Sequence, residues 1–178
     1  MGVAHMESNQ FDLALHYYQL ALRYYISAND YNKLSTQYTN LANTNLVLKK
    51  VDEAYEQAKL GEYYALKIGN HNLELNALHA LGKIQFVKGN LEEAKISLDR
   101  AISLAHEYGS ERIIREGLGT KALLEASKGD YSSAMALQQE YISELRKLRS
   151  TAIINALAVL QHQFKATQLN QEIEKLKQ

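Results

Sequence analysis

The sequence repeats itself about every 40 residues, and this feature limits the possible fold more than any other. Small side chains recur with this period in two registers. One register holds Ala14, Ala54, Ala94 and Ala134, and the other holds Gly2, Ala42, Gly82 and Ala122. A repeat of this length is typical of solenoids and related arrays. The chain is therefore predicted to be a stack of similar units.

Turn-forming residues keep the same period. One set comprises Asn and Gly residues that can adopt the left-handed conformation at a helix end, namely Asn29, Gly69 and Gly109. Residues of N-cap type follow directly, namely Asp30, Asn70, Ser110 and Ser150. A second turn is expected half a period away, at Asn9-Gln10, Lys49-Lys50, Gly89-Asn90 and Gly129-Asp130. Each unit should thus contain two turns.

The segments between these turns have helical periodicity. In the third unit Leu75, Leu78 and Leu81 recur at a spacing of three, and a second apolar face follows Gly89-Asn90. The sequence includes no proline, which long helices exclude. Each unit is therefore predicted to be two antiparallel helices of about 15 to 17 residues. One such pair leaves an apolar face open, so neighbouring pairs must stack, and an all-α solenoid results.

The third unit carries the residues of a known family. Leu81-Gly82, Gly89, Leu91, Ala94, Leu98 and Ala101 follow the order Leu-Gly, Gly, aromatic position, Ala, bulky residue and Ala. This order resembles the tetratricopeptide (TPR) repeat. The first unit offers Gly2, Phe11, Ala14, Tyr18 and Ala21, and the fourth offers Gly129, Tyr131 and Ala134. The opening Trp and the closing Pro of the common motif are missing.

The resemblance extends over residues 1 to about 148. HEAT and armadillo repeats have similar periods, but the spacing of the small residues favours the TPR. The period exceeds the common TPR length of about 34 residues and is similar to a longer-helix variety in bacterial regulatory proteins and some scaffolds. The resemblance implies a right-handed α-solenoid of TPR-like helix pairs with a long C-terminal helix. Residues 1–149 would form about four hairpins, the first truncated at its start.

Residues 150–178 are expected to form a separate helix. Arg149 stands where a left-handed Gly or Asn is expected, and Ser150 supplies an N-cap, so the helix should begin near Thr151. A first apolar stripe contains Ile153, Leu157, Leu160 and Phe164. A second has the spacing of a coiled-coil seam and contains Ala166, Leu169, Ile173 and Leu176. Two interpretations stay open, a helix that caps the solenoid and a linker that forms a homodimer.

The end of the chain resembles part of a larger signalling protein. Phe164, Glu172-Ile173 and Leu176 are similar to the helix that follows such repeats in bacterial sensor histidine kinases and GGDEF-type diguanylate cyclases. This resemblance implies a sensory or regulatory segment whose catalytic output domain lies outside the chain. Such a segment would be periplasmic in a membrane-anchored sensor, or else cytoplasmic. The alternative is part of a free-standing scaffold or adaptor.

The TPR resemblance also implies a concave groove that is lined by the first helix of each pair and that binds a peptide or protein. Carried over to this sequence, the groove residues are Thr36, Thr39, Asn43, Leu46, Asn76, His79, Lys83, Phe86, Glu116, Gly119, Leu123 and Ala126. Asn43 matches the Asn that often holds a peptide backbone in such domains. Val47 and Val87 occupy a place where the carboxylate-clamp subtype needs Lys, so that mode of binding is not expected.

Composition and motifs argue against other classes of function. Twenty basic and 20 acidic residues give no concentrated positive face for nucleic acid. The longest mainly apolar stretch, 152–160, is shorter than the roughly 20 residues of a membrane helix. The chain lacks Cys and the His-Glu-x-x-His motif, which removes thiolate and zinc-protease sites. The glycines of residues 117–121 lack phosphate-loop spacing and indicate close helix packing instead. We expect no metal, no cofactor, no membrane contact within this chain and no enzymatic activity.

Overall fold

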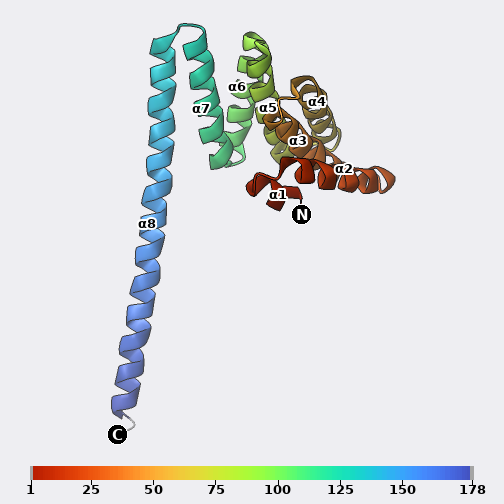
Figure 1. Cartoon of the computed structure of the whole chain (residues 1–178). Helices are drawn as coiled ribbons and strands as arrows, with labels where there is room; N and C mark the ends of the chain where they lie inside the picture. The colour runs from red at the N-terminus through yellow and green to blue at the C-terminus, as the bar shows by residue number, and fades with distance from the viewer. Residues whose placement is uncertain (1, 177–178) are drawn as a thin grey trace. The chain divides into compact units, whose positions relative to one another are not determined.

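The computed structural model describes the backbone of residues 2–176 and the side chains of residues 2–6, 8–152 and 154. All regular secondary structure in these residues is α-helical (Figure 1). The helices are α1 (Gly2–Glu7), α2 (Phe11–Ser27), α3 (Tyr31–Val47), α4 (Val51–Lys67), α5 (His71–Lys88), α6 (Leu91–Glu107), α7 (Glu111–Ser127) and α8 (Tyr131–Leu176). The prediction of an all-α solenoid of helix pairs is confirmed.

The turns between the helices recur twice in each period. Each contains one residue with a positive φ between 52° and 83°, and these residues are Asn9, Asn29, Lys49, Gly69, Gly89, Gly109 and Gly129. The left-handed residue lets the next N–H reach back to a free carbonyl at the helix end, as Asn70 N does to Ala65 O at 3.0 Å. The turn positions expected from the sequence up to Asp130 are confirmed.

Side-chain caps start three of the helices in the described part of the chain, and at α8 Asp130 accepts a hydrogen bond from Ser133 N at 3.0 Å. Asp30 accepts a hydrogen bond from Lys33 N at 3.0 Å, and Asn70 accepts one from Leu73 N at 3.2 Å. Ser110 makes no side-chain cap bond at the start of α7. Local capping therefore supports the repeat but is not the same at every turn.

The helix start expected at Ser150 is wrong. Helix α8 runs from Tyr131 to Leu176 without a break, so Arg149 and Ser150 lie inside it. Arg favours helix, and the segment has no Gly or Pro to interrupt it. The chain instead divides into two compact units after Gln138, and each is described by itself. The proposed seam at Ala166, Leu169, Ile173 and Leu176 lies outside the described side chains and stays a prediction.

Small residues bring the helices of the first compact unit, residues 1–138, close together. Ala42, Ala54 and Ala58 form one buried cluster with Leu81 and Ile84. A Cβ at Gly82 would lie 2.7 Å from Leu98 Cγ, and one at Gly117 would lie 2.7 Å from Ile102 Cγ1. Because real Cβ contacts are longer, such a close approach needs Gly at both places. Gly117 thus has the packing role that the sequence indicated.

The repeat extends to the contacts between successive helix pairs. Lys88 Nζ, at the end of α5, lies 2.5 Å from Asp52 Oδ1 at the start of α4. One period later, Lys128 Nζ lies 2.8 Å from Glu92 Oε1 in the same relation. Helix α3 contacts α5, and α5 contacts α7. The first helices of successive pairs therefore form one continuous face.

Within the part that the structure describes, no helix has both the length and the hydropathy needed to cross a membrane.

Candidate functional site: a polar groove on the first helices

A groove of about 500 Å³ lies on the face formed by the first helices. Its lining comes from α1, α3, α5 and α7, and comprises Met6, Thr36, Thr39, Asn40, Asn43, Leu46, Val47, Leu73, Asn76, His79, Lys83, Arg112 and Glu116. Eight of the residues predicted from the sequence are among them, namely Thr36, Thr39, Asn43, Leu46, Asn76, His79, Lys83 and Glu116. The structure thus brings together most of the expected residues of α3 and α5.

Four predicted residues do not line the groove. Phe86 packs against the buried cluster of Ala94, Leu98 and Leu124. Gly119, Leu123 and Ala126 lie further along α7, and Leu123 is 62% exposed. The cause is that α7 contributes only its first turns to the groove, through Arg112 and Glu116. The ring of Phe86 is used in the core between successive helix pairs.

Sequence reasoning missed Arg112 and Met6, as well as the neighbouring Asn40 and Leu73. Arg112 stands one helical turn before Glu116, and one period after Asn72. Counting one further turn toward the start of each first helix would have found it. Met6 stands one period before Leu46, which was also a usable signal.

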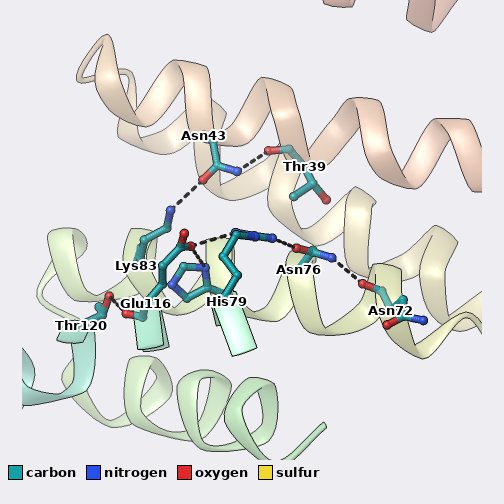
Figure 2. A network of polar contacts seen from close by, with 9 residues as sticks. Thr39, Asn43, Asn72, Asn76, His79, Lys83, Glu116 and Thr120 are labelled. Atoms are coloured by element: carbon teal, nitrogen blue, oxygen red, sulfur yellow. Dashed lines mark hydrogen bonds and ion pairs between the residues drawn. The ribbon is translucent and has the colours of Figure 1, made fainter. Parts of the chain in front are cut away.

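Lys83 and Asn43 connect α5 with α3 across the groove. The Lys83 ammonium donates a hydrogen bond to Asn43 Oδ1 at 3.0 Å (Figure 2). Asn43 Nδ2 in turn donates to the backbone oxygen of Thr39 at 3.1 Å. These two bonds fix which way the Asn43 amide points. Its oxygen faces Lys83, and one of the two N–H groups of its nitrogen is used within α3.

Arg112 and Glu116 connect α7 with α5. Arg112 donates to Glu116 Oε2 at 2.9 Å and also to Asn76 Oδ1. Asn76 Nδ2 donates to the backbone oxygen of Asn72. Glu116 Oε2 also lies 3.6 Å from His79 Nδ1 (Figure 2). A single carboxylate therefore serves both an arginine and a histidine.

His79 is neutral in this environment. The residue is 4% exposed, and burial lowers its pKa to about 3, helped by the positive charges of Lys83 and Arg112. Its Nε2 atom is buried without a hydrogen-bond partner in the part of the chain described. A neutral imidazole at this distance leaves the charge of the Glu116 carboxylate uncancelled.

Lys83 is a partly desolvated cation. Burial lowers its pKa, the charge of Arg112 lowers it further, and the charge of Glu116 opposes these effects. No carboxylate among the described side chains lies within 4.0 Å of its ammonium, whose one hydrogen bond goes to a neutral amide. The groove thus contains two cations and one anion. Its hydroxyls, amides and cations suit it to hold carbonyl and carboxylate oxygens.

Comparison with known proteins adds a structural relative. No protein-family model and no curated protein sequence matches the chain. Among solved structures, the TPR domain of Arabidopsis FLU superposes with a TM-score of 0.62, covering 66% of this chain and 98% of that domain at 20% sequence identity. The fold is a tetratricopeptide-like helical solenoid. This likeness concerns the fold alone.

The described residues also limit the chemistry of the groove. None of their His, Asp and Glu side chains form a group of three or more that could hold a metal ion. The polar side chains of the groove are tied to one another and to the backbone. The groove therefore provides a row of donors and acceptors across three helices.

Proposed function

We propose that this chain is a protein-interaction module that binds an extended peptide segment of its partner in the groove of α3, α5 and α7. The observation that carries this proposal is the groove itself, about 500 Å³ in volume, whose lining on α3, α5 and α7 is mostly polar. Oriented amides such as Asn43 and Asn76 can exchange hydrogen bonds with a peptide backbone. The TPR-like fold supports the same use, and the module requires no catalytic activity of its own.

Peptide selection followed by blocking of the groove tests this proposal. Random dodecapeptides displayed on phage would be selected on the full chain, and their affinities measured by fluorescence anisotropy. Thr36→Arg places a long cation in the groove, whereas Ser103→Arg adds the same side chain on the exposed outer side of α6. We expect Thr36→Arg to weaken binding at least 10-fold and Ser103→Arg to leave it unchanged. Equal effects of the two substitutions would place the binding site elsewhere.

We also propose that the module is the sensory or regulatory segment of a larger bacterial signalling protein, of histidine kinase or GGDEF type. The support is the residue pattern at the end of the chain together with the length of α8, which has 46 residues against 17 in α7. In this proposal the seam at Ala166, Leu169, Ile173 and Leu176 forms a homodimer.

Light scattering of the full chain tests the dimer. We expect a concentration-dependent dimer that is lost in the double variant Leu169→Glu, Ile173→Glu and is retained in the control Gln168→Glu, Gln171→Glu. The control adds the same two negative charges outside the seam. A wild-type monomer at all concentrations would favour the second candidate, a free-standing scaffold whose last helix does not dimerise.

A further inference from the structure

Among the described groove residues, Lys83 is the charged one that lacks an ion-pair partner. Arg112 is paired with Glu116, while the Lys83 ammonium has a single acceptor, the neutral oxygen of Asn43. An ammonium has three donors, so two remain unused within the part of the structure described. Buried or half-buried charges are normally paired, because desolvation without a partner costs free energy. The groove therefore keeps an unsatisfied cation where a ligand would lie.

Glu116 offsets this charge only in part. Its carboxylate is engaged by Arg112 at 2.9 Å and lies 3.6 Å from His79. Burial keeps His79 neutral, so the sum of Lys83, Arg112 and Glu116 is one net positive charge. An incoming carboxylate would bring that sum to zero. It would also occupy the two free donor positions of Lys83.

The surroundings of Lys83 point to the interior of a peptide rather than its end. Lys83 lies on α5, between α3 and α7 in the row of first helices that line the groove, and is bonded to α3 on one side. Lining residues continue on both sides, toward Met6 of α1 and toward Arg112 of α7. A peptide that ended with its terminal carboxylate on Lys83 would leave the lining residues on one side of Lys83 without contacts.

Apolar side chains lie next to this position. Met6, Leu46 and Val47 line the groove and come from the C-terminal ends of α1 and α3, and Met6 Sδ lies 3.2 Å from Thr44 Oγ1. Asn43, the partner of Lys83, is one turn before Leu46 and Val47 on α3. A side chain adjacent to the carboxylate would therefore meet an apolar surface.

We propose that Lys83 selects an Asp or Glu side chain in the interior of the bound peptide, with an apolar neighbour that packs on Met6, Leu46 and Val47. This inference rests on the proposed peptide-binding function and names the class of peptide. The lowered pKa of Lys83 supports it, because burial of the ammonium and the charge of Arg112 outweigh the charge of Glu116.

Selection with blocked peptide ends provides the test. Dodecapeptides would be displayed with their C-termini fused to the coat protein, so that none has a free C-terminal carboxylate, and selected on the full chain. We expect one acidic position with an apolar neighbour in the selected sequences. For an N-acetylated, C-amidated version, Glu→Gln at that position should lower the affinity at least 10-fold.

Variants of the protein connect that preference to Lys83. In Lys83→Gln the peptide Glu→Gln change should have less than a twofold effect, which is the result of a double-mutant cycle for two groups in contact. Lys88→Gln is the matched control, since Lys88 lies on the same helix but pairs with Asp52 outside the groove. Lys83→Gln should fold with a Tm no lower than that of the wild type, because it removes an uncompensated charge. A Tm well below that of the wild type would contradict the absence of an ion-pair partner for Lys83.

The outcomes separate this inference from the proposed function. Peptides that Thr36→Arg blocks but that show no acidic preference, or that keep their preference in Lys83→Gln, would overturn the role of Lys83 alone. Peptides that Thr36→Arg does not affect would overturn groove binding itself. Selection that succeeds only when the peptide C-terminus is free would show that Lys83 takes a terminal carboxylate, which contradicts an internal acidic residue.

Discussion

Lys49 and Arg149 both stand where the spacing of the turns expects a left-handed residue, Lys49 after a first helix and Arg149 after a second, yet their backbones differ. Lys49 has a φ of 61° and lies in the turn after α3, whereas Arg149 lies inside α8. Both are long basic residues without a preference for the left-handed region, which costs an L-residue roughly 1 to 2 kcal/mol. Local preference therefore does not decide which of them forms a turn.

The difference lies in the segment after each residue. After Lys49, helix α4 buries Ala54, Ala58, Gly61 and Ala65. After Arg149, the described side chains of Thr151, Ala152 and Ile154 are exposed. A turn at Lys49 brings an apolar helix face into the core, and this burial offsets the strain of the turn. A turn at Arg149 gains no such burial, so the helix continues.

The contrast in packing should give the largest difference in stability. Leu98 in α6 is 0% exposed, whereas Leu148 in α8 is 43% exposed. We expect Leu98→Ala to lower the free energy of unfolding by about 2 to 5 kcal/mol, and Leu148→Ala by less than about 0.5 kcal/mol. Urea denaturation followed by circular dichroism measures both. An equally large loss at Leu148 would contradict this contrast, since it would mean that this part of α8 is packed in solution.

Acid should destabilise the repeats, because their packing buries a titratable group, His79. The pKa of His79 is about 3 in the folded state against an ordinary 6.5, so between these values the unfolded state binds more protons. Stability is then complete above pH 6.5 and falls as the pH drops toward 3, by about 1 to 3 kcal/mol from pH 7 to pH 4. Urea midpoints at several pH values measure this slope.

Two variants attribute the slope to His79. His79→Gln should flatten it, since the titrating group is gone. The control His106→Gln replaces a histidine that is exposed on α6 and should keep the wild-type slope. If His79→Gln kept the full slope, the imidazole would not be the group whose protonation opposes folding.

A smaller effect, of opposite sign at the two positions, is expected from glycine substitutions. Lys49→Gly should raise the free energy of unfolding by about 1 kcal/mol, because glycine adopts a positive φ without steric cost. Arg149→Gly should weaken α8 by about 1 kcal/mol and reduce its helical signal. Circular dichroism and urea denaturation distinguish the two. Destabilisation by Lys49→Gly would show that its side chain contributes more than its backbone strain costs.

The smallest effect is expected from the ion pairs that recur between successive helix pairs. Lys128 and Glu92 are exposed, as is Lys88 in the equivalent pair. Exposed pairs of this kind contribute little and are screened by salt. Glu92→Gln should leave the urea midpoint unchanged at high NaCl concentration. A clearly lower midpoint under these conditions would show that the ion pairs help to hold successive helix pairs together.

The sequence allowed the turns and most of the groove to be predicted because both follow from periodicity. Helices of equal length, joined by equal turns, place residues such as Asn43 and Lys83 on the same face. The direction of Phe86 could not be predicted in this way, since it depends on space left beside Leu98 and Leu124. The neutral state of His79 could not be predicted from the sequence either, because it depends on burial and on Arg112, which belongs to the next helix pair.

Because the turns are regular, successive helices alternate between the groove side and the outer side of the solenoid. Adding or removing one whole period leaves every later helix on its own side of the solenoid, whereas a change of half a period would exchange the groove side with the outer side. The groove can therefore lengthen only by whole helix pairs. A duplication of one repeat would extend the contact surface without disturbing the bond between Lys83 and Asn43. The length of the ligand and the chemistry at Lys83 can thus evolve as independent traits.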